Sequence, residues 1–214
     1  MNSKFENDVK KYFFKIKKSN HPLSISIKDD QGNKIGVLEL ITWRDVGNKK
    51  LIRLLSRWRD AASWYFPSQF KVTNRGTSIW LRKALLEKED RVLFLIKDLK
   101  GAPLGHMGLF TFDFEGKSCE IDNVIRGEKG VPGLMTFALY ALINWTFENI
   151  SIQKLYLKVF KDNIRAISLY ERCGFIPKKN IPLYKRVEDE TVYWEELEKE
   201  GKPDRYFLLM EYNK

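Results

Sequence analysis

Lys154-Leu-Tyr-Leu-Lys-Val-Phe160, followed by Lys161-Asp-Asn163 and Arg165-Ala-Ile-Ser-Leu-Tyr-Glu-Arg-Cys-Gly-Phe175, is the stretch that decides the fold. Its first seven residues alternate with a period of two and favour a β-strand. Asp162 or Asn163 then offers an oxygen that can cap a helix N-terminus, and Gly174 stands where helices commonly end in a left-handed residue. The apolar residues between them recur at helical spacing: Ile164, Ile167, Leu169 and Tyr170. The stretch therefore predicts a strand, a tight corner and a short helix.

The bulk properties predict an ordered globular protein. A chain of 214 residues with 43% hydrophobic and 14% aromatic residues can bury a sizeable core within one large domain. The N-terminal residues contain no apolar signal region and no stretch is long enough to cross a bilayer, so we expect a soluble, cytoplasmic protein without membrane contacts. Cys119 and Cys173 are too few for a disulfide framework, and with only His21 and His106 besides them no metal site is expected.

The formal net charge of +10 favours an anionic partner. Its basic residues are spread over several segments, and the sequence has no helix-turn-helix, zinc-finger or RNA-recognition signature. Nucleic acid is therefore not the expected partner, whereas a small anionic substrate stays open.

The remaining elements follow from periodicity and turn residues. Residues 29–33 form a turn signal between two alternating segments and predict a β-hairpin. Three later segments, separated by short turns, predict an antiparallel meander. The expected strands are 23–28, 35–40, 91–97, 103–112, 118–125 and 205–212, and the expected helices are 51–60, 79–88 (capped by Thr77 or Ser78) and 134–147.

An Asn directly after a strand and the helix end Leu169-Tyr-Glu-x-x-Gly-Phe175 closely resemble the acetyl-CoA-binding half of the GNAT acyltransferase superfamily. The resemblance implies an α+β (α/β-like) fold with a mixed, mostly antiparallel central sheet and helices on both faces. The resemblance extends over residues 35–214, which we therefore expect to form the acyltransferase domain. Residues 1–34 are expected to form an N-terminal β-hairpin extension. The pieces Trp58-Arg59-Asp60 and Trp80-Leu81 resemble branches that acylate amino sugars or protein N-termini.

Residues 126–133, Arg-Gly-Glu-Lys-Gly-Val-Pro-Gly, lie between a strand and a helix and suit phosphate binding. Glycines allow close backbone approach, and a helix N-terminus presents free N–H groups. By resemblance this segment is the pyrophosphate loop, although its glycine spacing is wider than the family's, so which amides contact phosphate stays open. The resemblance also places Asn163 near the pantetheine arm. The expected acetyl-CoA-binding residues are Asn123, Val124, Ile125, Arg126, Gly127, Gly130, Gly133, Leu134, Phe160, Asn163 and Tyr170.

Three side chains are candidates for the chemistry. By resemblance Tyr170 points at the cofactor sulfur, where a phenol can protonate the departing thiolate. Glu120 and Asp122 project from one face of a predicted strand, and a carboxylate there can deprotonate an ammonium acceptor. Glu120 is the first choice and Asp122 the second, with an exposed surface pair as the alternative. His106 is a weaker candidate.

These features together predict an acetyl-CoA-dependent N-acyltransferase that acts by direct attack in a ternary complex. The expected acceptor is a primary amine on a small molecule such as a nucleotide-linked amino sugar, bound between the N-terminal helices and residues 176–204, with stacking on Tyr184, Tyr193 or Trp194. A protein N-terminus or lysine is the alternative acceptor, and an acyl-carrier protein the alternative donor. A non-catalytic module that binds nucleic acid or protein is the rival function. A homodimer stays open.

Overall fold

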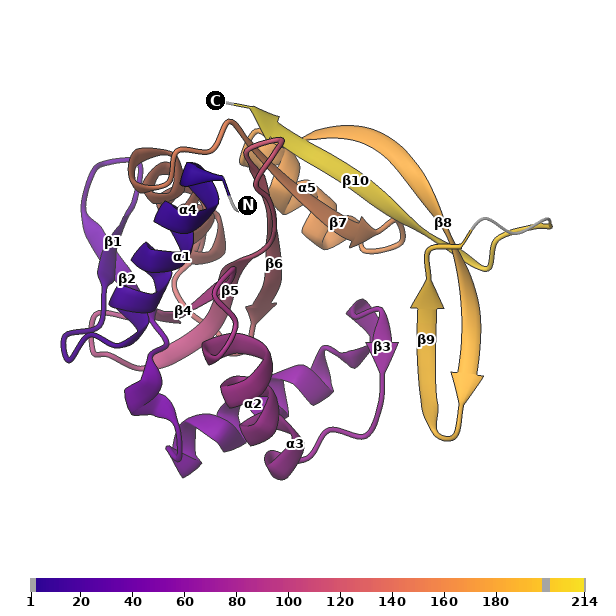
Figure 1. The fold of residues 1–214 in the computed structure, drawn as a ribbon, viewed down its shortest axis with the longest axis horizontal. Coiled ribbons are helices and arrows are strands. Elements are labelled where there is room, and N and C mark those ends of the chain that lie inside the picture. Colours follow the sequence, from indigo (N-terminus) through magenta and orange to yellow (C-terminus); the bar gives the residue numbers. More distant parts are fainter. Residues whose placement is uncertain (1–2, 198–200, 214) are drawn as a thin grey trace.

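The computed structural model describes residues 3–197 and 201–213. Within these residues the strands form a ten-stranded sheet, ordered β1-β2-β4-β5-β6-β7-β10-β8-β9-β3 (Figure 1). Neighbouring strands are antiparallel except β6 and β7, which run parallel. The sheet is therefore mixed and mostly antiparallel, as the sequence predicts. The strands are β1 Ser24–Lys28, β2 Lys34–Leu40, β3 Ser68–Gln69, β4 Val92–Lys97, β5 Pro103–Asp113, β6 Ser118–Arg126, β7 Lys154–Phe160, β8 Ile176–Glu188, β9 Thr191–Glu195 and β10 Arg205–Asn213.

Helices cover both faces of the sheet. In the buried strand β4, Phe94 and its alternate neighbours pack into one core with α1, α4 and α5, while Leu93 and Leu95 pack into a second core with α2 and η3. A strand covered on both sides reads as a continuous apolar run, and residues 92–96 do so. The helices are α1 Lys4–Lys17, α2 Lys49–Ala61, α3 Asn74–Ile79, the π-helix η3 Trp80–Leu86, α4 Leu134–Asn149 and α5 Ile164–Arg172, with short 3-10 turns η1 Trp43–Asp45 and η2 Ser63–Tyr65.

The stretch that decides the fold has the predicted form. β7 leads into α5, and Asn163 is the N-cap residue, because its Oδ1 accepts a hydrogen bond from the Ala166 N–H at 3.2 Å. Gly174, after the helix end, has a φ of +90°. The corner between β7 and α5 therefore holds Asn163 at a fixed place beside the sheet.

Two predictions about the N-terminal part are corrected. Residues 4–17 form the helix α1, where the sequence predicted only a hairpin extension; the hairpin itself is β1–β2, and the boundary proposed after residue 34 falls at the start of β2. The second N-terminal helix is capped by Thr73, not by Thr77 or Ser78, and it continues as the π-helix η3. The Thr73 side chain accepts the Gly76 N–H at 3.0 Å, so the helix starts a full turn earlier.

The helix α1 is joined to η3 by a buried lysine. Lys17 Nζ donates to the carbonyls of Leu85, at 3.1 Å, and of Lys88, which lie at the end of η3. Burial lowers the pKa of Lys17 to about 8. Since carbonyls at a helix end lack intrahelical partners, this cation takes the place of a C-terminal cap.

The segment 176–204 contributes a long hairpin to the sheet. β8 pairs with β10 at its start and with β9 at its end, so β8 and β9 project beyond the rest of the sheet (Figure 1). β9 in turn pairs with β3. Among the described residues no helix is long and apolar enough to cross a membrane.

Candidate active site

The parallel strands β6 and β7 part soon after they start. Their pairing joins Ser118 to Lys154, Cys119 to Leu155 and Glu120 to Tyr156. Beyond Glu120, β6 continues beside β5 and β7 continues beside β10, and Figure 1 shows the two strands diverging from their shared end. The facing edges carry backbone N–H and C=O groups that the sheet does not use, which makes them available to a ligand.

A β-bulge in β6 lies on this open edge. Asn123 has a φ of +53°, and two residues of β6, Asn123 and Val124, lie opposite one residue of β5. His106 Nδ1 lies 2.6 Å from the Asn123 carbonyl, to which it donates a hydrogen bond. Burial lowers the pKa of His106 to about 4, so the ring is neutral at pH 7. His106 therefore stabilises the bulge, and a bulge re-aims the residues that follow it.

A cavity of about 1270 Å³ occupies the space between the parted strands. This volume exceeds that of a typical single-ligand pocket, about 300–1,000 Å³, and leaves room for two substrates side by side. The residues predicted to bind acetyl-CoA, together with the candidate bases Glu120 and Asp122, all line it: Glu120, Asp122, Asn123, Val124, Ile125, Arg126, Gly127, Gly130, Gly133, Leu134, Phe160, Asn163 and Tyr170.

The loop 126–133 enters α4 without a capping side chain. Its last residue, Gly133, has a φ of +78° and is the N-cap residue of α4, whose first turn contains no acidic residue. The first-turn residues Met135 and Thr136 line the cavity. A helix start of this kind favours an anion, because its N–H groups lack intrahelical partners and the helix dipole is positive there.

Not every amide of this loop faces the cavity freely. The N–H groups of Gly127 and Glu128 both donate to the Leu104 carbonyl at 2.9 Å, which ties the loop to β5. The other side of the loop is tied to α2, since the Trp58 indole N–H donates to Glu128 Oε1 at 3.0 Å and Arg57 pairs with the same carboxylate. Gly127 therefore contributes to the site by allowing this close packing rather than by donating its amide.

The carboxyl groups of Glu120 and Asp122 belong to the cavity wall and not to an exposed surface. Burial, followed by the neighbouring charge of Asp122, raises the pKa of Glu120 to about 7, and Lys158 opposes this shift. Burial also raises the pKa of Asp122, against two hydrogen bonds from Asn123, whose N–H donates at 2.5 Å and whose Nδ2 donates at 3.0 Å. Glu120 can therefore exchange a proton near neutral pH.

Tyr170 reaches the cavity from α5, on the β7 side. Its side chain is buried and packs edge-on against Phe175. Burial and the nearby charge of Asp122 raise the pKa of Tyr170 above its usual value, so the phenol keeps its proton at neutral pH. A carboxyl group that can accept a proton and a phenol that can give one thus line the same cavity from its two sides.

The acceptor side of the cavity differs from what the sequence predicted. Of the three aromatic residues expected there, Trp194 lines the cavity, whereas Tyr184 and Tyr193 do not. Instead, the Tyr193 ring packs against Arg186, whose guanidinium carbon lies 4.3 Å from the Tyr193 ring centroid. The sequence did not identify six other aromatic residues of the lining: Trp58, Tyr65, Phe66, Phe70, Trp80 and Phe207.

Arg59 is a further cavity residue to which the sequence assigned no role. Its guanidinium lies 3.9 Å from the Phe66 ring centroid, and Nη2 donates to the Ser68 carbonyl at 2.6 Å. Burial lowers the pKa of Arg59 to about 10, which leaves it protonated at pH 7. Its position in Trp58-Arg59-Asp60, on the apolar-rich helix α2, was the one signal that could have identified it.

Comparisons with known proteins find the same fold elsewhere. The family model described as acetyltransferase (GNAT) domain matches residues 37–176. A spermidine N(1)-acetyltransferase of Vibrio cholerae is 22% identical over 135 residues, which are 63% of this chain and 77% of the relative. The solved structure of the Vibrio cholerae spermidine N-acetyltransferase with CoA and spermine superimposes with a TM-score of 0.62 at 16% identity, covering 85% of this chain and 96% of that one. A probable GNAT acetyltransferase from Chromobacterium violaceum has a TM-score of 0.62 at 15% identity, covering 88% and 89%.

The packing of Gly127 against Trp58 leads to a testable prediction. A Cβ atom at residue 127 would lie 2.0 Å from Trp58 Cε2, and the buried ring has no room to move away. We expect Gly127→Ala to lower the free energy of unfolding by about 1–3 kcal/mol, measured by urea denaturation, because overpacking displaces the loop or the helix. Gly130→Ala is the matched control: its added Cβ meets the ends of two leucine side chains, which can shift, so the loss is smaller. Equal stability of both variants and the wild type would contradict this packing.

Proposed function

The chain belongs to the acetyltransferase (GNAT) domain family and is an acetyl-CoA-dependent N-acetyltransferase, and we propose that it acetylates the primary amine of a small molecule by direct attack in a ternary complex. The single observation that carries this proposal is the cavity between the parted strands β6 and β7, lined by Glu120 from one side and Tyr170 from the other. One cavity for donor and acceptor suits direct transfer, because it brings the reacting groups together without an enzyme-bound intermediate.

The donor side of the cavity fits acetyl-CoA in its chemistry. The unpaired edge of β6 at residues 123–125 can hold the amide-bearing pantetheine arm, and the uncapped start of α4 with Arg126 can hold the pyrophosphate. Gly130, Gly133, Leu134, Phe160 and Asn163 line the same side. Acetyl-CoA supplies the acetyl group as an activated thioester, and free CoA is the leaving group.

The residues of the cavity divide the proton transfers between them. Glu120 takes the proton from the acceptor ammonium, and its burial, with the charge of Asp122 beside it, keeps its pKa near that of a useful base. Tyr170, which stays protonated, donates its proton to the departing sulfur. Among the described residues no cluster of three or more His, Cys, Asp or Glu side chains could hold a metal ion.

For the acceptor, the cavity wall favours an amino sugar linked to a nucleotide. Arg59 and Lys71 place positive charge there, and Phe70 and Trp194 offer rings on which a planar group can stack. The acidic residues Glu195 and Glu196 also line the cavity, but they pair with Arg186 and Lys158. Their charges are therefore already compensated.

A polyamine is the second candidate acceptor. The two Vibrio cholerae relatives named above are spermidine acetyltransferases, and the solved structure contains spermine. The buried carboxyl groups of Glu120 and Asp122 would attract a polycation as well as a single ammonium. The two candidates differ in the charge that they bring to the basic wall around Arg59.

One experiment tests the function and separates the acceptors. Acetyl-CoA binding is measured by isothermal titration, and CoA release is followed with UDP-glucosamine, with spermidine, and with UDP-N-acetylglucosamine as the blocked-amine control. We expect acetyl-CoA to bind, UDP-glucosamine to be acetylated with the higher kcat/KM, and the blocked amine to be inert. Faster acetylation of spermidine would establish the second candidate, and absence of acetyl-CoA binding would refute the proposed function.

Tyr170→Phe tests the general-acid assignment. The ring and its packing against Phe175 are retained and only the hydroxyl is lost. We expect kcat to fall by about 10²–10⁴-fold while the Kd for acetyl-CoA stays nearly constant, because the proton is needed only when sulfur departs. Tyr140→Phe is the control: the Tyr140 side chain does not line the cavity, although its hydroxyl donates to the carbonyl of Arg172, which does. An unchanged kcat in Tyr170→Phe would remove Tyr170 from this role.

The pKa of Glu120 predicts the pH dependence of the reaction. Below pH 7 the carboxyl group is protonated and cannot take the ammonium proton, so wild-type kcat/KM should rise with an apparent pKa of about 7. In Glu120→Gln that rise should disappear and the rate should drop by about 10²–10⁴-fold. The pH profiles of both proteins are recorded with the same acceptor, so that the titration of the acceptor amine affects both equally. Glu115→Gln, in the exposed turn after β5, serves as the control. A profile that keeps its rise in Glu120→Gln would shift the role to Asp122.

A further inference from the structure

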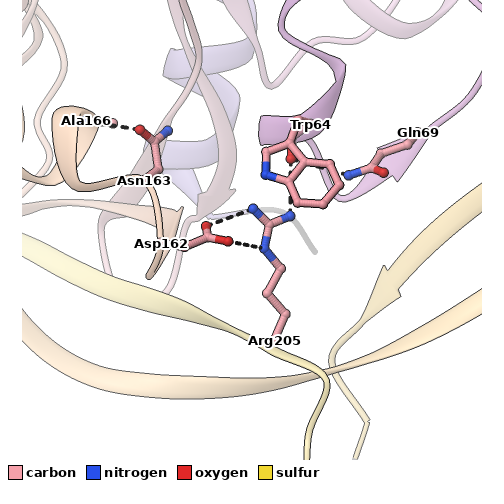
Figure 2. A network of polar contacts seen from close by, with 6 residues as sticks. All are labelled: Trp64, Gln69, Asp162, Asn163, Ala166 and Arg205. Atoms are coloured by element: carbon pink, nitrogen blue, oxygen red, sulfur yellow. Dashed lines mark hydrogen bonds and ion pairs between the residues drawn. The ribbon is translucent and has the colours of Figure 1, made fainter.

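Arg205, the first residue of β10, is a buried cation that three separate segments share. Its Nε and Nη2 donate to the two carboxylate oxygens of Asp162 at 3.0 and 2.7 Å, and its Nη1 donates to the Trp64 carbonyl at 3.1 Å (Figure 2). The guanidinium also lies 3.4 Å from the ring centroid of Phe160 and 5.3 Å from that of Trp194. A planar guanidinium can make forked and stacked contacts at once, and a lysine cannot.

Each contact of Arg205 belongs to a different part of the active site. Asp162 directly precedes Asn163, the N-cap of α5 on the donor side, and Figure 2 shows the two side chains on the same corner. Trp64 lies in η2, which follows the Arg59-bearing helix α2. Trp194 lies in β9 and lines the acceptor side of the cavity. The cation therefore stands where the donor corner meets the acceptor wall.

The acceptor wall is also attached through Arg59, which donates to the Ser68 carbonyl, through the ion pair of Lys158 with Glu196, and through the packing of Trp194 on Phe160. β3 pairs with β9 through only two residue pairs, and the Trp194 N–H donates to the Pro67 carbonyl at 2.7 Å. Gln69 of β3 adds a side-chain hydrogen bond to the same Trp64 carbonyl that Arg205 uses. β10, by contrast, is already held by β7 from Phe207 to Asn213 and by β8 on its other side. Arg205 is thus not needed to fix its own strand.

We propose that Arg205 is a positioning residue that holds the η2–β3–β9 wall in register with the β7–α5 corner and so sets where the acceptor amine lies relative to the thioester. The proposal rests on the transfer reaction inferred above and extends it to a residue with no part in the chemistry. It accounts for an ion pair whose carboxylate partner, Asp162, is 52% exposed and could be solvated without it. Loss of Arg205 should therefore misalign the acceptor amine with the thioester, and the rate of acyl transfer is sensitive to such misalignment.

The test compares Arg205→Met with a matched arginine. Arg91 also stacks on an aromatic ring, pairs with a carboxylate and donates to a backbone carbonyl, but its partners Phe110, Asp90 and Ala84 do not line the cavity. For Arg205→Met we expect kcat/KM for the better of UDP-glucosamine and spermidine to fall about 10- to 100-fold, with the Kd for acetyl-CoA changed by less than about threefold. Arg91→Met should change both by less than about threefold. Arg205→Lys keeps the positive charge but cannot form both hydrogen bonds to Asp162, so it should recover part of the lost kcat/KM.

A second measurement needs no acceptor and separates this inference from the proposed function. Amide hydrogen exchange of Trp194 and of residues 64–66 should accelerate about tenfold or more in Arg205→Met, while exchange in β6 stays at the wild-type rate. Asp162→Asn weakens the ion pair with Arg205 and should accelerate exchange of the same amides to a smaller extent. This variant provides the test if Arg205→Met does not fold. Unchanged exchange in the wall would overturn the inference, as would a parallel loss of acetyl-CoA affinity and acceptor kcat/KM. Failure of the wild type to acetylate either acceptor would count against the proposed function alone.

Discussion

The early end of the pairing between β6 and β7 is the constraint on which the rest of the structure depends. Two adjacent strands that stop pairing leave backbone groups unsatisfied, and this is costly unless water or a ligand takes them up. Here the parting starts after Glu120 and opens the cavity at the centre of the sheet. The bulge at Asn123, held by His106, lies on the opened edge. The separation of the strands thus creates both the binding groups and the space.

An opening in the middle of a sheet needs supports on both sides. On the β6 side, the loop before α4 is fixed between β5 and α2, through the Leu104 carbonyl and the Trp58 indole. On the β7 side, β10 is inserted between β7 and β8, and its first residue reaches back to Asp162. These supports use buried or stacked side chains, which have few alternative positions. The two edges of the cavity are therefore held by strand pairing on their outer sides, with β5 and with β10, and by these side-chain contacts.

Local sequence patterns predicted most of this framework, because alternation, caps and turn residues act within a few positions. The helix α1 was missed among its many lysines, although Ser3 and Glu6 form an N-terminal capping signal. The contacts that align the site could not be predicted in the same way. Trp58 and Glu128 lie 70 positions apart, and Arg205 and Trp64 lie 141 apart. Such pairs form only once strand order is known, and β10 takes its place between two strands that precede it in the chain.

The protein as a whole is positively charged, but the wall beside the reacting groups carries two carboxyl groups. The net charge of +10 favours anions at long range, whereas the wall beside the reacting groups carries Glu120 and Asp122. Long-range fields are screened beyond about 10 Å at moderate salt, while buried groups are screened much less. An acceptor that combines one ammonium with an anionic body would satisfy both environments: its amine would meet Glu120 and its body would meet Arg59. A polycation would gain at the carboxyl groups and lose at the basic wall. The arrangement of charge along the cavity is the reason for which we propose an acceptor of mixed charge.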